Sequence, residues 1–249
     1  MSPEEHFAIV GLSTATGELI QEYNTSAWPG ADGRRMLIVD FLPSLKGAPH
    51  ALVVGRILGG EQMLYLWDTS SPNLSPAFLG PLNTSGGDLT WDEDGGVLFE
   101  LLPGANDDES GSLLMYSVAS GAPPSPMGTP IALKDHFSFP QFDPLTKTIF
   151  GLSLASGGTN GYIRELTDLD PATGKVSTRG TLGEFYVDLE NGPKAFDPQN
   201  RRSFYMLATS PMGQFDAVAV DVDTGKVLQF LGLCGFIGYC PEGFTYGPG

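Results

Sequence analysis

A phrase of about fifty residues recurs along the chain and constrains the fold more than any other feature. Each copy has alternating apolar residues, then a turn rich in Thr, Ser and Gly, then a second short apolar run. The turns centre on Gly17, Ser71, Gly121, Gly174 and Gly225, so successive turns lie 54, 50, 53 and 51 residues apart. Alternation predicts strands, and a turn Gly supplies the positive φ of a tight hairpin. Each copy therefore predicts a β-hairpin.

A second phrase lies upstream of these turns. It begins at Phe142, 32 residues before Gly174, and at Phe196, 29 residues before Gly225. Its closest copies are PQFDPLTKTIFGL and PKAFDPQNRRSFYML, while LTWDEDGGVLFELL and MLIVDFLPSLKGAPHALVVG are looser versions. With the hairpin, each unit holds four short strands, which is the composition of one β-propeller blade.

The repeat predicts an all-β fold, a five-bladed β-propeller of four-stranded antiparallel blades in a single domain over residues 1–249. The chain starts in a hairpin at residues 6–23, and the final EGFTYGPG matches a lone first strand. We expect this strand to join the hairpin and close the ring, with the second strand of that blade either missing or formed by another segment. The alternative is a fragment of a longer propeller. The predicted blade units are 1–30 with 240–249, 31–80, 81–130, 131–180 and 181–235.

The composition excludes several classes of protein. Thirteen Lys and Arg against 29 Asp and Glu give a net charge of −16, which argues against a nucleic-acid partner. A hydrophobic content of 41% argues against a disordered acidic chain. No run reaches the roughly 18 apolar residues of a membrane span, so no membrane partner is predicted. We expect a monomer.

The sequence leaves two cellular compartments open, the cytoplasm and the exterior of the cell. The start MSPEEHFAIV has neither the basic region nor the apolar run of a secretory signal, so a native Met1 predicts a cytoplasmic protein. A trimmed signal would make it secreted, and three glycosylation sequons start at Asn24, Asn73 and Asn83. Cys234 and Cys240 form either a disulfide or two reduced thiols, and their spacing is not a zinc pattern.

The phrase F-D-P…F-Y-x-L…V-D-x-x-T-G-K-V resembles the repeats of quinoprotein-like and lactonase-like propellers of the broad YVTN and WD40-like group. The resemblance extends over essentially the whole chain. It concerns the fold rather than a functional site, because the phrase encodes strands and turns. It implies a ligand or substrate held at one end of the central channel. No site motif of that group matches residue by residue.

Long connections between blades are expected to gather at one face, and loops on a rigid frame commonly carry function. We place them at 24–36, 76–89, 126–139, 179–194 and 231–243. Their polar residues include carboxylates, and a pair of these could act as acid and base in catalysis. The same carboxylates, together with neighbouring oxygen atoms, could instead bind Ca²⁺. The catalytic candidates are Asp88, Glu190 and Glu242, and the ligand-binding candidates are Arg34, Arg35, His136, Phe137 and Asn191. Lys194 belongs to the same polar set.

The main functional prediction is a propeller that binds a small polar molecule or a protein at this loop face, because no catalytic motif is present. The alternative is a hydrolase or lactonase-like enzyme with acidic residues and a divalent cation at the channel mouth. Other acidic residues are predicted to be structural. Asp170 and Asp221 should accept hydrogen bonds from turn amides, and Asp92 belongs to a turn between the first two strands of its blade.

Overall fold

The computed structural model describes residues 8–12, 19–24, 37–44, 50–56, 62–71, 75–82, 87–102, 111–118, 122–133, 137–154, 162–186, 194–208 and 215–230. Every regular element in these ranges is a β-strand. The chain divides into two compact units, of which the first contains β1 to β6 and the second β7 to β19.

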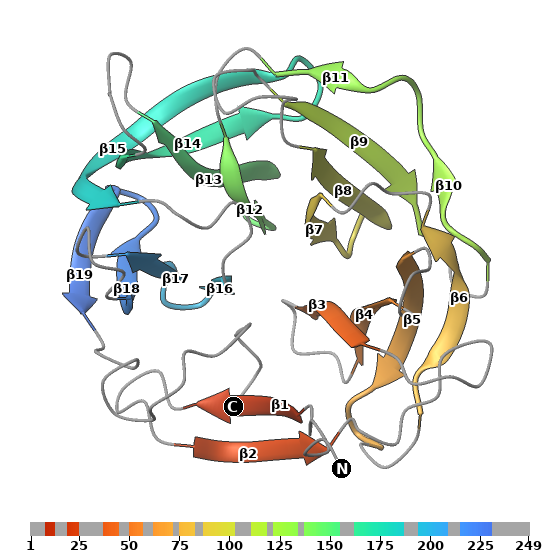
Figure 1. Cartoon of the computed structure of the whole chain (residues 1–249). Coiled ribbons are helices and arrows are strands. Elements are labelled where there is room, and N and C mark those ends of the chain that lie inside the picture. Colours follow the sequence, from red (N-terminus) through yellow and green to blue (C-terminus); the bar gives the residue numbers. More distant parts are fainter. Residues whose placement is uncertain are drawn as a thin grey trace, which may run out of the picture. The chain divides into compact units, whose positions relative to one another are not determined.

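The first unit contains one strand pair and one four-stranded antiparallel sheet of order β3-β4-β5-β6 (Figure 1). Tyr65 and Trp67 are fully buried in that sheet, and Phe41 meets Trp67 edge-on with ring centroids 5.8 Å apart. The strands are β1 (Ala8–Leu12), β2 (Leu19–Asn24), β3 (Leu37–Pro43), β4 (His50–Arg56), β5 (Gln62–Asp68) and β6 (Ala77–Leu82).

The second unit contains three blades, each an antiparallel run of four successive strands (Figure 1). The first strands of the three blades are β7, β12 and β16, and β12 lies beside both of the others. The first blade contains β7 (Asp88–Asp92), β8 (Val97–Leu102), β9 (Ser112–Ser117) and β10 (Ser125–Pro126), with β11 (Ile131–Ala132) also paired to β9. The second contains β12 (Ser138–Asp143), β13 (Thr148–Leu154), β14 (Tyr162–Asp170) and β15 (Lys175–Tyr186), and the third β16 (Lys194–Asp197), β17 (Arg202–Ala208), β18 (Phe215–Asp221) and β19 (Lys226–Phe230).

The prediction of an all-β propeller of four-stranded antiparallel blades is therefore confirmed, whereas the count of five blades is not. The described part of the chain contains four such blades and the β1–β2 pair. The strand predicted to complete a fifth blade, within 240–249, lies outside the described residues. Parts of the predicted connections are also strand. β6 lies within 76–89 and β11 within 126–139, and β15 runs on to Tyr186 because it stays paired with β14.

Aspartates at strand ends organise the turns as the sequence predicted. Asp170 Oδ1 accepts from the Ala172 amide at 2.9 Å, and Asp221 Oδ1 accepts from the Thr224 amide at 2.8 Å. Each turn ends on a glycine with a φ of +67°, namely Gly174 or Gly225. Because L side chains rarely adopt this conformation, the recurring Thr-Gly is a requirement of the backbone.

Aromatic side chains join neighbouring blades of the second unit. Phe99 stacks on Phe142 with centroids 5.9 Å apart, which links the blade of β7 to the blade of β12. On the other face of the β12 blade, Phe150 meets Phe196 edge-on at 4.9 Å. The middle blade is thus covered by a neighbour on each face, and its first strand is buried along its whole length.

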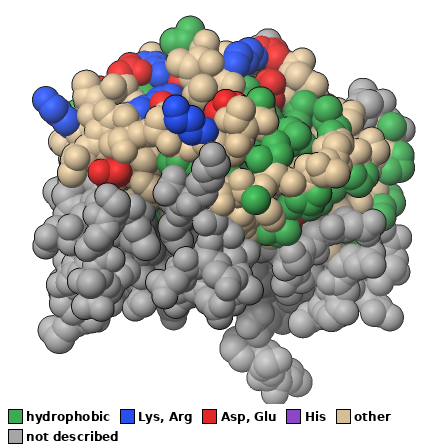
Figure 2. Space-filling model, turned by 90° about the horizontal axis from the view of Figure 1, so that it is seen from above, with side chains coloured by type: hydrophobic (Ala, Val, Ile, Leu, Met, Phe, Trp, Pro, Cys, Tyr) green, Lys and Arg blue, Asp and Glu red, His purple; other side chains and the backbone are tan. Residues whose placement is uncertain are grey.

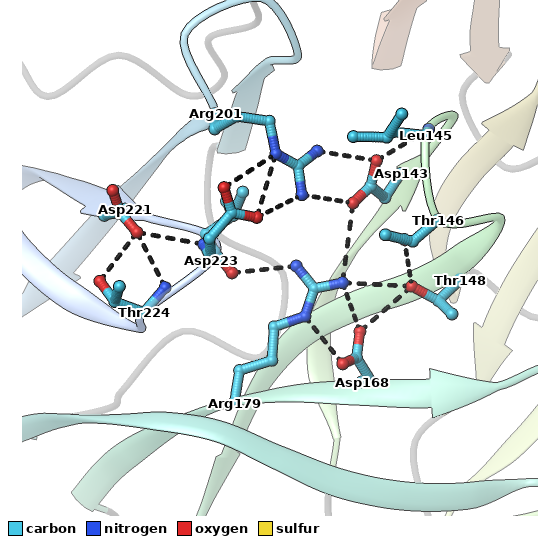
Figure 3. A network of polar contacts seen from close by, with 11 residues as sticks. Asp143, Leu145, Thr146, Thr148, Asp168, Arg179, Arg201, Asp221, Asp223 and Thr224 are labelled. Carbon is cyan, nitrogen blue, oxygen red and sulfur yellow. Dashed lines mark hydrogen bonds and ion pairs between the residues drawn. The ribbon is translucent and has the colours of Figure 1, made fainter.

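A network of charged side chains also links the two blades that start at β12 and β16 (Figure 3). Arg201 donates two parallel bonds to the fully buried Asp143 carboxylate, at 2.9 and 2.8 Å, and also binds Asp223. Arg179 lies 3.7 Å from the same carboxylate and forms a 2.6 Å ion pair with Asp168. Two-point binding of this kind fixes geometry as well as charge, so the network holds the two blades in register.

On the face seen in Figure 2, positive and negative side chains lie among one another rather than in separate patches. Much of the acidity in these ranges serves turns and ion pairs such as Lys147–Asp94, which measures 3.0 Å. No helix among the described residues is long and apolar enough to cross a membrane.

Replacing Asp143 with Asn should lower the free energy of unfolding by about 1.5 to 3 kcal/mol, because Arg201 loses its two-point contact with a buried carboxylate, while Arg201 keeps Asp223 and Arg179 keeps Asp168. Urea denaturation at pH 7 measures the loss. Asp223→Asn is the matched control: it shares Arg201, but its side chain is 56% exposed, so about 1 kcal/mol or less is expected. Equal losses in the two variants would contradict the role of Asp143.

The same variant tests the electrostatics of the network. Burial alone would raise the pKa of the Asp143 carboxyl, but hydrogen bonds from Arg201, Thr146 and the Leu145 amide outweigh it and lower the pKa. The stabilisation is therefore present above the unfolded value of about 4 and is lost as the pH falls through the lower, folded value. We expect the difference between wild type and Asp143→Asn to shrink when urea denaturation is repeated at acidic pH.

Candidate functional site

Two charged side chains meet where the innermost strands of the second unit begin. Asp88 is the first residue of β7 and Lys194 is the first residue of β16. The Lys194 ammonium donates to Asp88 Oδ1, and the two side chains are only 10% and 7% exposed. The contact joins residues 106 positions apart, from strands on either side of β12.

The strand registers explain why these two side chains converge. Asp88 and Thr90 point to one face of β7, and the cross-strand partner of Thr90 is Phe99, which stacks on the β12 blade. Lys194 and Phe196 likewise share the face of β16 that packs on Phe150. Because alternate residues of a strand share a face, both charged groups are directed toward the middle blade. We infer that the ion pair spans the start of β12.

A buried carboxylate supports the backbone next to Asp88. Glu100 on β8 is fully buried and accepts from the Gly87 amide at 3.2 Å and from the Tyr116 hydroxyl at 3.0 Å. Burial, and then the charge of Glu100, raises the pKa of Tyr116, so its hydroxyl remains a proton donor at neutral pH. A Cβ on Gly87 would lie 2.2 Å from the Leu101 carbonyl oxygen, so this close approach requires glycine.

The start of β12 contains a bulge. Its register shifts between Ser138 and Gln141, and Phe139 between them has a φ of +54°. The Phe139 ring is 1% exposed and meets Tyr205 edge-on at 5.9 Å. Positive φ is unusual for a bulky residue, and bulges recur beside active sites, where they redirect side chains. The irregular backbone lies between the strands that carry Asp88 and Lys194.

Of the predicted site residues, two lie within the described part of the chain. Asp88 lies at the start of a strand and binds Lys194, whereas its predicted carboxylate partner Glu190 lies outside the described residues. Phe137 is 6% exposed and belongs to a hydrophobic cluster with Phe142 and Ile149, as a core residue would. In the described ranges no group of three or more acidic, His or Cys side chains could hold a metal ion. The remaining candidates, Glu190, Glu242, Arg34, Arg35, His136 and Asn191, lie outside the described residues.

Sequence reasoning placed Lys194 in the polar set without giving it a role, and it overlooked Glu100 and Tyr116. Glu100 was missed because a single acid inside the apolar VLFELL looks like the exposed side of a strand. The pairing of Lys194 with Asp88 could have been considered from the sequence, because the repeat places both residues at the starts of equivalent strands.

Comparison with known proteins places the chain in no established family. No family model matches it, and no curated protein does. Similar solved structures include a periplasmic gluconolactonase of Pseudomonas aeruginosa, at 17% identity over 92% of this chain with a TM-score of 0.36. A putative 6-phosphogluconolactonase of Bacteroides uniformis has 12% identity over 90% of this chain and a TM-score of 0.44. An uncharacterised Listeria monocytogenes protein has 12% identity over 91% and a TM-score of 0.40.

This chain spans 63% of the length of each of these three structures. Two of the three are named as lactonases. At these identities and TM-scores, no fold or residue role is taken from the likeness.

A double-mutant cycle should reveal the coupling between Asp88 and Lys194. Either Asp88→Asn or Lys194→Met removes one charge of a nearly buried ion pair, so we expect each to lower the free energy of unfolding by about 1.5 to 3 kcal/mol. The double variant removes both charges and should be markedly more stable than the sum of the single losses predicts. Urea denaturation of the four proteins measures this, and additive losses would show that the two side chains are uncoupled.

Proposed function

We propose that the start of strands β7, β12 and β16 is the active site of a lactonase-like hydrolase acting on a small polar ester or lactone. The observation that carries the proposal is the contact of Asp88 with Lys194. A nearly buried carboxylate and ammonium, next to a strained bulge at Phe139, are the kind of arrangement found where chemistry is performed.

The two charges have complementary roles in ester hydrolysis. In the free protein the Lys194 ammonium neutralises Asp88. When a substrate carbonyl oxygen takes the ammonium, the Asp88 carboxylate becomes available to remove a proton from water. The water oxygen attacks the carbonyl carbon, and Lys194 stabilises the oxyanion that develops. The ester C–O bond then breaks and the leaving oxygen takes the proton from Asp88, which gives a carboxylic acid and an alcohol from an ester, or one hydroxy acid from a lactone.

The activity test uses initial rates of hydrolysis, above the uncatalysed rate, for δ-gluconolactone, δ-valerolactone and 4-nitrophenyl acetate. Asp88→Asn should lower kcat on the accepted substrate by about 10²- to 10⁴-fold through loss of the base. Lys194→Met should lower it by about 10²- to 10³-fold through loss of oxyanion stabilisation. Asp223→Asn, an exposed member of the charged network, is the control and should retain activity. A double variant Asp88→Asn, Lys194→Met that folds and keeps wild-type rates would refute the assignment.

The same assay tests whether the proposed active site needs a divalent cation. A rate that falls with EDTA and returns with Ca²⁺ would add a cation to the proposed site. Melting curves with EDTA and with Ca²⁺ provide a readout that does not depend on turnover.

The second candidate is a binding protein without turnover for a small polar ligand. The same charge pair favours it, because a ligand with one acceptor and one donor could bind Lys194 and Asp88 together. Binding without hydrolysis of any substrate in the panel would support this reading over the enzyme.

We also propose that β1 and β2 belong to a fifth blade, which the strand predicted within 240–249 completes. The recurring turn spacing supports this, since Gly17 precedes Ser71 by one repeat length. Deleting residues 243–249 should lower Tm by several degrees, because a closing strand removes an open sheet edge. An unchanged Tm in the shortened protein would count against the fifth blade.

A further inference from the structure

The outer edge of the β7 blade is interrupted by a short loop, residues 127–130. β9 is paired with β11 near its start and with β10 near its end. After β10 the Met127 amide still donates to the Met115 carbonyl at 2.8 Å, and the chain pairs with β9 again from Ile131. All four residues of the loop are exposed. A Cβ on Gly128, whose φ is +70°, would meet no heavy atom within 4 Å, so the loop extends into open space.

Two hydroxyl groups of this edge come directly before a proline. Ser125 precedes Pro126 inside β10, where it lies opposite Ser117 in the sheet ladder. Thr129 precedes Pro130 in the loop, and no hydrogen bond joins it to any part of the chain that the structure describes. The two residues therefore share a local sequence and differ in whether their backbone is paired.

Pro130 favours the backbone conformation that an enzyme acting on Thr129 would need. A proline ring disfavours helical backbone at the preceding residue, so Thr129 is biased toward an extended chain. A protein kinase binds its substrate chain in an extended form, with the hydroxyl directed at the γ-phosphate of ATP. Because proline has no amide hydrogen, the pocket for the residue after the hydroxyl must be apolar and require no backbone donor.

The sequence around Thr129 excludes other kinds of kinase. From Ser110 to Leu133 the chain has no charged residue. A kinase that recognises arginines before the hydroxyl, or carboxylates after it, would find no ion pair to form here. The proline after Thr129 is therefore the feature that a kinase could recognise.

We propose that Thr129 is a phosphorylation site for a proline-directed Ser/Thr protein kinase. Thr129 Oγ1 attacks the γ-phosphorus of ATP, and the bond from that phosphorus to the β,γ-bridging oxygen breaks. The hydroxyl proton passes to the catalytic aspartate of the kinase, and the products are phosphothreonine and ADP. The site does not depend on the proposed hydrolase activity, so either proposal can fail without the other.

Phosphorylation would change the character of this edge. Met127 is 40% exposed, and its neighbours Pro126 and Pro130 are exposed as well. A phosphate on Thr129 adds a charge of about −1.5 to −2 at neutral pH among these apolar side chains. Since a charge opposes the packing of a second apolar surface, the modification would convert an apolar edge into an anionic one.

The test incubates the folded protein with ATP and one of two purified kinases. A mitogen-activated protein kinase is proline-directed, whereas the cyclic-AMP-dependent protein kinase requires arginine. Peptide mapping by mass spectrometry distinguishes Thr129 from the other Ser-Pro and Thr-Pro dipeptides of the chain. We expect the proline-directed kinase to phosphorylate Thr129 and the arginine-dependent kinase to leave it unmodified. Pro130→Ala should lower the initial rate at Thr129 about tenfold or more, because it removes the recognised residue.

Ser125→Ala is the matched control, since it removes the other hydroxyl that precedes a proline and should leave the rate at Thr129 unchanged. A synthetic peptide of residues 122–133 tests recognition of the sequence without the fold. Phosphorylation of the peptide but not of the folded protein would show that the loop is inaccessible and would overturn the proposal. An unmodified Thr129 in both, or an unchanged rate in Pro130→Ala, would overturn it as well.

Discussion

The second unit depends on the packing of one blade against the next. A blade is a small sheet with two faces, and a sheet of this size is stable only when an apolar face is covered. The middle blade, β12 to β15, is covered on both faces, by Phe99 on one side and by Phe196 on the other. Its first strand is therefore buried throughout, and even its Gln141 and Asp143 are inside the protein. Polar groups on that strand therefore need hydrogen-bond partners inside the protein, either in their own blade, as for Ser138, or in a neighbouring blade, as for Asp143.

The two ends of β12 meet this requirement differently. At its C-terminal end, Asp143 receives two parallel bonds from Arg201 and a backbone amide from its own turn. At its start, no residue of β12 carries the charge, and instead Asp88 and Lys194 meet from the strands on either side. The first arrangement stabilises the boundary between blades. The Asp88–Lys194 pair instead places two charged groups at a position where the apolar faces of the blades could pack without them.

Much of the architecture was readable from the sequence because strands and turns are local. Alternation predicted the strands, and the Asp and Gly of DPATG and DVDTG predicted turns that are observed with Gly174 and Gly225 at positive φ. The number of blades was not readable in the same way, since closure depends on contacts between the ends of the chain. The length of β15 was underestimated because pairing with β14, rather than composition, carries that strand beyond its turn.

The candidate site was only partly predictable. Asp88 was identified from its position at a strand start, but its partner depends on which faces of β7 and β16 point toward β12, and this is set by register. The edge-on contact of Tyr205 with Phe139 likewise depends on the bulge at the start of β12 and has no counterpart in the sequence pattern.

The difference between the two ion pairs also separates stability from chemistry. A guanidinium that binds both oxygens of Asp143 is rigidly oriented and stays charged at any ordinary pH, so that pair is suited to holding blades together. The ammonium of Lys194 is a point charge on a flexible stem and can turn from a carboxylate to a substrate oxygen without breaking a two-point contact. Its exchange of partners would uncover the Asp88 carboxylate at the moment a ligand arrives. Arginine would be better suited to a purely structural link at the start of β12, and this contrast supports the proposed role of Asp88 and Lys194.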